Sequence, residues 1–481
     1  MRNVLSPIGG LFLVAALLAS QSGCGGEGDG DGEEPAPAVC PEGDEIRGQC
    51  AGVPQAALCD EDACTDGVEC AETVTAGDDS ALASALTGAA AGTCIALAPG
   101  SYGAVTLPAG VRLLGKSADS VSVESITLGP GNGGVVRGVS VGAGGIVVQG
   151  KGATIESVRV LGAEMAGIDV ANEAAVTVRG STIEGGSRYG ITAADGATVT
   201  VENTLVEGND GPGVWAACSA DCDCAAPPDL VMKSSIVRDN HVGGIVLFGS
   251  MMLLEAVDVT GTLVGDDFAY GLGGGGVSVA GCSRLTARDL HVFDSQSYGL
   301  LIDDSNATVG DPTGATSIEV SGNAIGVWAQ HISQSAPQTV TLDGLTVDDN
   351  AGVGIGAAGD SVGLIICKTA VTRTKMSDLY VAGGGSQQVG DGLLWLDGSE
   401  ITIDSLSLGG SARASVVIDG EATGAMSNIT LSDGDEAKGI VQQGYSGGAQ
   451  PTTDEGAPPI TTSPDALFAI PEAPVSVPRD L

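Results

Sequence analysis

The most constraining feature of this sequence is a short phrase that recurs along most of the chain. Two apolar residues stand five positions apart, and after a turn a glycine leads into an apolar strand. The apolar pairs are Val178 and Ile183, Val201 and Val206, Met232 and Val237, Ala287 and Val292, and Leu342 and Val347. The glycine-led strands begin at Gly167, Gly190, Gly213, Gly244, Gly276, Gly299, Gly326 and Gly354. Such repetition predicts a solenoid, in which each repeat packs mainly on its neighbours.

The last apolar residue of each phrase serves as a register mark. The marks are Val141, Val160, Ile183, Val206, Val237, Val259, Val292, Val320, Val347, Val381, Leu408 and Leu431. Most steps lie between 22 and 34 residues, and the shortest recurring step is near 23. Three short strands and their turns use about that length, so longer steps indicate inserted loops, expected at 217–228, 260–275 and 359–373. The marks predict an all-β solenoid of about 12 coils.

A turn position follows each mark by three residues. It is filled by Gly186, Asn209, Asn240, Ser295, Asn323 and Asn350. Glycine and asparagine tolerate the left-handed backbone conformation, so we expect that conformation at these positions. Stacked asparagines can also hydrogen-bond from coil to coil.

The start of the solenoid needs a cover, because an open end exposes strand edges and core. Residues 79–91 have a helical period, with Leu82, Leu86 and Ala89 on one face. Asp78 or Asp79 can cap the first turn. This segment predicts a capping helix.

With these coils the chain resembles the right-handed parallel β-helix proteins of the pectate-lyase-like superfamily, over roughly residues 93–440. The resemblance implies a substrate groove along an outer strand face and a polysaccharide partner. The calcium-assisted lyases use several carboxylates and an arginine, and the polygalacturonases use a motif series that is absent here as a set. The sequence therefore favours a binding or structural scaffold that contacts glycans, with a polysaccharide-active hydrolase or lyase as the alternative.

The first residues read as an export signal. Arg2 precedes an apolar run from Ile8 to Ala19, which is too short to span a bilayer. The segment resembles a bacterial lipoprotein signal, which implies lipidation of Cys24; simple secretion is the alternative. We expect a cell-envelope protein, either an outer-membrane lipoprotein or an extracellular protein, that meets the membrane only through this anchor.

Five segments are expected. They are a signal peptide (1–23), an acidic flexible tether (24–38), a small Cys-rich module at the start of the solenoid (39–75), the β-helix (76–444) and a Pro-rich tail (445–481).

The chain has 12 cysteines, which in an exported protein predicts disulfides. One group is Cys40, Cys50, Cys59, Cys64, Cys70 and Cys94, and the other is Cys218, Cys222, Cys224, Cys282 and Cys367. Within the second group we expect Cys222 or Cys224 to bond Cys282, although the cysteine cluster is also compatible with zinc. Once Cys24 is set aside, one of the remaining eleven stays free or pairs elsewhere.

The formal net charge of −41 disfavours nucleic acid and anionic lipid as partners. We expect a monomer without a cofactor. Calcium remains an alternative, because acidic residues recur at coil corners and hard oxygen ligands suit this ion. These corner residues are Glu207, Asp210, Asp239, Asp294, Asp348 and Asp349.

Within each glycine-led strand, the first residue after glycine should point inward and the second outward. Two neighbouring coils then place Tyr298, Asp303 and Asp304 beside Trp328, Gln330 and His331 on an outer face. Aromatic rings stack on sugars, and carboxylates serve as acid and base. Asp303, Asp304 and His331 are therefore the catalytic candidates, and the alternative is a mixed polar surface. We call these six residues the Trp328 cluster.

A second group lies on earlier coils. Asp169, Arg188, Tyr189 and Trp215 combine aromatic rings with opposite charges on the same outer face. They are candidate ligand-binding residues, and the alternative is a surface ion pair beside packed rings. We call these four residues the Tyr189 cluster.

Overall fold

The computed structural model describes residues 43–46, 49–53, 68–131, 133–219, 221–265, 273–310, 317–331, 338–359, 362–380, 386–396, 398–421, 423–432, 439–447, 450–454, 457–468 and 470–471. The expected signal peptide and tether, Cys24 included, lie outside these residues. Among the described residues, no helix has the length and apolar character needed to cross a membrane.

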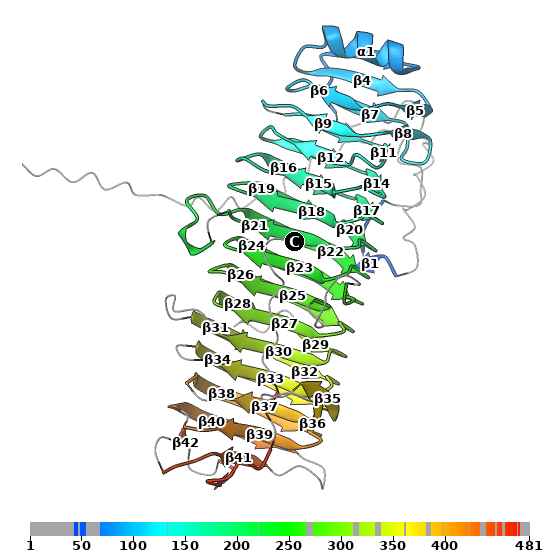
Figure 1. Ribbon diagram of the computed structural model, residues 1–481. Helices are drawn as coiled ribbons and strands as arrows, with labels where there is room; N and C mark the ends of the chain where they lie inside the picture. The colour runs from blue at the N-terminus through cyan, green and yellow to red at the C-terminus, as the bar shows by residue number, and fades with distance from the viewer. Residues whose placement is uncertain are drawn as a thin grey trace, which may run out of the picture. The chain divides into compact units, whose positions relative to one another are not determined.

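The described chain winds into a parallel β-helix whose coils stack on one another (Figure 1). Each regular coil contributes one strand to each of three faces. Face 1 is a separate sheet of 15 parallel strands. They are β6 (Val105–Leu107), β9 (Ile126–Leu128), β12 (Ile146–Val148), β15 (Ala166–Val170), β18 (Tyr189–Ala194), β21 (Val214–Ala217), β23 (Gly243–Phe248), β25 (Gly275–Ala280), β27 (Tyr298–Asp303), β30 (Ile325–Gln330), β33 (Val353–Ala358), β37 (Asp391–Trp395), β39 (Ala414–Asp419), β41 (Ile440–Gln443) and β43 (Ile460–Thr462).

Faces 2 and 3 belong to one bent sheet of 24 strands. Face 2 contains β3 (Glu72–Ala76), β4 (Thr93–Leu97), β7 (Arg112–Gly115), β10 (Val135–Arg137), β13 (Ala153–Glu156), β16 (Ala175–Arg179), β19 (Thr198–Glu202), β28 (Asn306–Gly310), β31 (Gln338–Asp343) and β42 (Thr452–Thr453). Face 3 contains β5 (Gly100–Tyr102), β8 (Val121–Val123), β11 (Ser140–Val141), β14 (Arg159–Leu161), β17 (Thr182–Glu184), β20 (Leu205–Glu207), β29 (Ile318–Ser321) and β32 (Leu345–Asp348). Long strands cross both faces: β22 (Asp229–Arg238), β24 (Met251–Thr260), β26 (Arg284–Phe293), β34 (Val362–Thr372), β38 (Glu400–Gly409) and β40 (Thr423–Leu431).

Each long strand turns from face 2 to face 3 at a single residue with positive φ. Examples are Ser234 (φ 45°), Asp289 (φ 53°) and Ser405 (φ 73°). One left-handed residue bends the strand sharply without ending its pairing with the neighbouring coils.

The register marks are vertical neighbours as the sequence predicts. Val160 pairs in register with Ile183, Ile183 with Val206, and Val206 with Val237. The mark Val381 lies outside the described residues and is wrong, because its place between Val347 and Leu408 is taken by Val371, which pairs with both. The segment expected as the loop 359–373 contains strand β34, and the true insertion that follows it holds the hairpin of β35 (Ser377–Tyr380) and β36 (Ser386–Val389).

The interior is one continuous apolar core. Inward side chains of the three faces meet along the coil axis, and examples with 0% exposure are Ile168, Val178, Ile245 and Leu300. Alternation along each strand sends every second side chain to this core. Burying such side chains supplies most of the stabilisation, at about 25 cal/mol per Å² of apolar surface.

The predicted row of corner asparagines is present. Their side-chain amides hydrogen-bond to the backbone of the neighbouring coil, but the left-handed backbone conformation lies at another residue. Asn209, Asn240, Asn323 and Asn350 are at most 1% exposed, and each side-chain oxygen accepts a backbone N–H from the preceding coil. The positive φ values fall one residue earlier, at Gly208, Asp239, Gly322 and Asp349. The expectation of left-handed asparagines is therefore wrong by one position. The residue before the asparagine turns the chain, which aims the amide inward.

Helix α1 (Asp79–Gly88) covers the first coil, as predicted (Figure 1). The Asp78 side chain accepts a hydrogen bond of 2.8 Å from Ala81 N and caps the first turn. Leu82 is 3% exposed and joins the core beside strands β3 and β4. The helix therefore covers apolar surface that the first coil would otherwise expose to water.

The N-terminal residues pack elsewhere than expected. The hairpin of β1 (Glu45–Ile46) and β2 (Gln49–Cys50) lies against face 3 at β22 and β24 (Figure 1). Ile46 and Ala51 form an apolar cluster with Leu205 and Ile236. Asp44 Oδ1 lies 2.8 Å from an Arg238 guanidinium nitrogen. Described residues 43–53 thus pack along the side of the solenoid, whereas residues 68–75, with Cys70 and most of strand β3, lie at its start as expected.

Disulfides clamp the first coil and one later loop. Cys70 bonds Cys94 between β3 and β4, and Cys50 is also disulfide-bonded. Cys222 bonds Cys282, which confirms the expected bridge across coils, and Cys218 bonds Cys224 around the short 3-10 helix η2 (Asp221–Asp223). Cys367 is the free cysteine of the described residues. Cys40, Cys59 and Cys64 lie outside them.

The last coil extends into the segment expected as a tail. β42 pairs with β40, and β43 pairs with β41. The chain beyond β43 returns to face 1, where Phe468 and Ile470 pack on apolar side chains.

We predict that Asn323→Ala lowers the free energy of unfolding by about 2–3 kcal/mol, because it leaves the buried Ser295 N–H without its 2.9 Å acceptor. Urea denaturation monitored by circular dichroism measures the change. Asn306→Ala is the control, since Asn306 is exposed and accepts one backbone bond from Thr339. Equal losses for the two variants would contradict a special role of the buried ladder.

Candidate functional site

The structure brings the Trp328 cluster together on face 1. In β27 and β30, Leu301 is in register with Trp328, and Asp303 is in register with Gln330. Asp304 and His331 follow directly at the ends of these strands, where His331 Nδ1 lies 2.8 Å from Asp304 Oδ1. The vertical adjacency inferred from the repeat is therefore confirmed.

The expectation that this cluster is exposed is wrong. Trp328 is 0% exposed, Tyr298 and Gln330 are each 1% exposed, and Asp303 is 7% exposed. Tyr298, Leu301 and Trp328 belong to a second apolar cluster, separate from the interior core. The side chains do point away from the coil axis, but other parts of the chain cover them.

Two described segments form part of this cover. Val389 of the β35–β36 hairpin belongs to this second apolar cluster, which extends over several coils of face 1, and Leu379, Phe468 and Ile470 pack against it. Gln443 fastens the C-terminal segment, since its side-chain oxygen accepts Leu467 N at 2.9 Å and Phe468 N at 2.7 Å. A large substrate therefore meets a covered face here and not an open groove.

The two large rings fit against glycines of adjacent coils. A Cβ added at Gly275 would overlap the Tyr298 ring, and one added at Gly356 would overlap the Trp328 ring. Burial raises the pKa of Tyr298 to about 12, an effect that the Ser278 hydroxyl opposes and the Asp303 charge reinforces. Trp328 Nε1 is buried and has no hydrogen-bond partner among the described residues. Tyr298 and Trp328 are therefore packed side chains on face 1 and do not form an accessible binding surface.

The Tyr189 cluster lies at the border of the open part of face 1. The Tyr189 and Trp215 rings are 5.6 Å apart, and the Arg188 guanidinium lies 5.2 Å from the Tyr189 ring centre. Thr192 Oγ1 donates a 2.6 Å hydrogen bond to Asp169 Oδ1 on the preceding coil. Burial raises the pKa of Tyr189, and the Arg188 charge opposes this shift.

Exposure along the outer row of face 1 changes at this cluster. Thr106 is exposed, and Thr127, Val147, Asp169 and Thr192 are partly exposed. Trp215 is 7% exposed, and the following members of the row, from Val246 through Val417, are buried. Trp215 also contacts Phe248 at a ring separation of 5.5 Å. The accessible part of this outer row therefore ends at the packed rings of Tyr189, Trp215 and Phe248.

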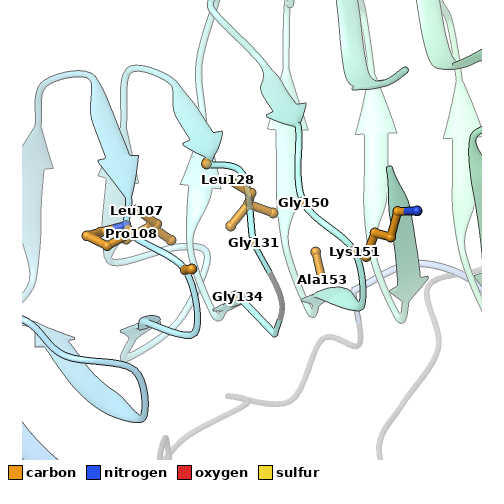
Figure 2. A pocket seen from close by; sticks show the side chains of 10 residues that line it. Leu107, Pro108, Leu128, Gly131, Gly134, Gly150, Lys151 and Ala153 are labelled. Carbon is orange, nitrogen blue, oxygen red and sulfur yellow. The ribbon is translucent and has the colours of Figure 1, made fainter. Parts of the chain in front are cut away.

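A pocket in the first coils is too small to hold a sugar. Figure 2 shows this pocket, lined by glycines and by Leu107, Pro108, Leu128, Ala153 and Lys151, with a volume of about 10 Å³. That volume holds about one water molecule.

A larger depression of about 400 Å³ lies on the corner after face 3 and is lined by Leu161, Glu184, Glu207 and Asp239 with adjacent glycines. Burial raises the pKa of Glu184, and the neighbouring Glu207 charge adds to the rise. The sequence reasoning missed Glu184. Its position directly after the register mark, equivalent to Glu207 one coil later, was the available signal.

Several acidic corners are paired with cations from the next coil. Arg238 Nε lies 2.7 Å from Glu207 Oε2, and Lys375 Nζ lies 2.8 Å from Asp349 Oδ2. Arg373 likewise binds Asp348. In the described part of the chain, no group of three or more histidine, cysteine or acidic side chains is arranged to hold a metal ion.

Residues 131–273 match the family model described as the right handed beta helix region. With the parallel sheets, this match identifies a right-handed parallel β-helix, as the sequence predicts. Comparison with curated protein sequences gives no match.

Solved structures with a similar fold include three carbohydrate-active enzymes. Pectate lyase Pel9A is 12% identical, with 62% of this chain and 80% of that chain covered and a TM-score of 0.40. The catalytic unit of the GH87 α-1,3-glucanase of Streptomyces thermodiastaticus strain HF3-3 is 16% identical, with coverages of 85% and 71% and a TM-score of 0.42. The A-module of mannuronan C-5 epimerase AlgE6 of Azotobacter vinelandii is 14% identical, with coverages of 62% and 91% and a TM-score of 0.39. Such low similarity says nothing about the activity of this chain.

We predict that stability falls between about pH 10 and pH 12, in part through Tyr298. Its folded-state pKa is about 12, whereas an unfolded tyrosine ionises near 10. The folded state therefore holds the proton longer, and its contribution is complete below pH 10 and lost as the pH rises through 12. The loss is at most about 2.7 kcal/mol, from about 1.4 kcal/mol for each pKa unit.

Tyr298→Phe lacks the ionisable group, so its unfolding free energy should fall less steeply over the same pH range. Denaturant unfolding of both proteins at several alkaline pH values gives the comparison. Parallel curves would show that Tyr298 ionises normally.

Proposed function

We propose that the protein is an exported β-helix scaffold that binds neutral glycans on the open part of face 1. The observation that carries this proposal is the change in exposure at the Tyr189 cluster. There a row of partly exposed polar side chains meets a wall of aromatic rings. A sugar ring has an apolar face for an aromatic ring and hydroxyls for polar groups, so this combination suits it.

Each member of the Tyr189 cluster has a role in this proposal. Tyr189 provides the accessible ring, and Trp215 supports it from the next coil. Asp169 on the preceding coil and Thr192 on the same strand as Tyr189 offer hydrogen-bonding groups. Arg188 is exposed beside Tyr189 and adds donors for sugar oxygens.

The negative net charge of the chain favours neutral glycans over anionic ones. A formal net charge of −41 repels polyuronates and other polyanions. Neutral glycans are not repelled, and no metal ion is required to bridge them to the surface. The scaffold therefore favours uncharged polysaccharide as its partner.

The alternative function is a hydrolase or lyase at Asp303, Asp304 and His331. The close pair of Asp304 and His331 favours it, because a carboxylate can orient an imidazole for proton transfer. The burial of Asp303 and Trp328 under the chain's own segments weighs against it.

Binding of neutral glycans should depend on the Tyr189 cluster. Tyr189→Ala and Arg188→Ala should each weaken binding about 10-fold or more, since stacking and the adjacent donors contribute roughly 1–2 kcal/mol each. A glycan array followed by calorimetry on the hits measures the effect.

Arg179→Ala is the matched control, because Arg179 is also exposed but lies on face 2. Equal binding by all variants would place the glycan site elsewhere. New reducing ends or an unsaturated product from a bound glycan, lost in the Asp303→Asn, Asp304→Asn double variant, would support the alternative function.

The anchor proposed for this scaffold is a lipid on Cys24. Cys24→Ser should release the protein from the membrane fraction, because serine lacks the thiol to which the lipid would be attached. Mass spectrometry of the mature N-terminus gives the direct measurement. An unmodified N-terminus on the wild-type protein would favour simple secretion.

A further inference from the structure

A serine, a histidine and an aspartate meet on the outer side of face 3, away from both clusters. His291 Nδ1 lies 3.2 Å from Asp258 Oδ1, and His291 Nε2 lies 3.1 Å from Ser317 Oγ. The sequence pattern alone does not single out this group. The missed signal lies in the register, since β24 and β26 pair Asp258 with His291.

The order of contacts is that of a nucleophile, a base and an orienting carboxylate. A carboxylate at Nδ1 favours the tautomer with the proton on that nitrogen. Nε2 is then an acceptor, so the Ser317 hydroxyl donates to it. This is the arrangement in which histidine removes the proton of an attacking serine.

Asp258 and His291 are held in place by strand pairing, whereas Ser317 is accessible to solvent. Asp258 and His291 lie within long strands that pair with both neighbouring coils, and their side chains are 24% and 22% exposed. Ser317 is exposed at the start of β29. The Phe293 ring lies 5.5 Å from the imidazole and provides an apolar surface beside it.

The surrounding charges define what can approach. Asp289 Oδ1 lies 4.0 Å from His291 Nε2, and Glu319 is in register with His291 on the next coil. These carboxylates, with Asp258, repel anions. An uncharged substrate is therefore favoured. It reaches the group from the side of the exposed Ser317, because the β1–β2 hairpin packs on the neighbouring strands β22 and β24.

We propose that Ser317, His291 and Asp258 form an acyl-transfer site for uncharged carboxylic esters. Ser317 Oγ attacks the ester carbonyl while its proton passes to His291 Nε2. The bond from the carbonyl carbon to the alkoxy oxygen breaks, and the alcohol leaves with that proton. Water then attacks the acyl-enzyme, gives a proton to His291, and releases the acid as Ser317 recovers its proton. Asp258 orients the imidazole throughout.

A biotin-linked fluorophosphonate tests the proposal on the full chain. This probe phosphonylates serines that a base activates. One adduct should form, and peptide mass spectrometry should place it on Ser317. His291→Asn should slow labelling about 100-fold or more, since general-base assistance has that magnitude. Asp258→Asn should slow it through misorientation of the imidazole. Hydrolysis of p-nitrophenyl acetate should fall in parallel.

Ser321→Ala is the matched control, because Ser321 lies on the same strand and contacts Glu319 but not His291. Circular dichroism confirms that each variant is folded. Labelling of Ser317 that is unchanged in His291→Asn would overturn the proposal. The same conclusion would follow if Ser317 were not labelled at all, or if labelling were spread over several serines.

Discussion

The architecture depends on parallel hydrogen bonding between coils. Neighbouring strands lie about 4.8 Å apart, so a residue meets its counterpart on the next coil whatever the sequence between them. Equivalent residues of successive coils form vertical rows, so the side chains of one row must be able to pack on or hydrogen-bond to one another. Apolar residues continue inside, and asparagines continue at the corner, where Asn209 binds Asn240 and Asn323 binds Asn350. The corner bonds satisfy backbone groups that the sharp turns would otherwise leave buried and unpaired.

Much of the fold was predictable because equivalent residues of successive coils recur at similar spacings in the sequence. The marks from Val160 to Val237 and the capping helix depend on local patterns, and the structure confirms both. Val381 was misassigned because the sequence inserted after β34 offers an apolar residue at a plausible spacing. Periodicity alone cannot tell a coil from an insertion of similar length.

The site was less predictable, since alternation shows only which side of a strand a residue occupies. It placed Trp328 and Asp303 correctly on the outer side of face 1. It could not show that Leu379, Phe468 and other segments cover that side. The position of the β1–β2 hairpin against Leu205 and Ile236 was hidden for the same reason. Such contacts join distant segments and follow no period.

Two large rings that pack on glycines make particular pairs of neighbouring coils depend on each other. Tyr298 needs the space above Gly275, and Trp328 needs the space above Gly356. In this region each bulky side chain is matched to a glycine one coil away. Duplication or loss of a single coil here would set a ring against a side chain. The solenoid therefore cannot gain or lose a coil in this region without repacking these rings.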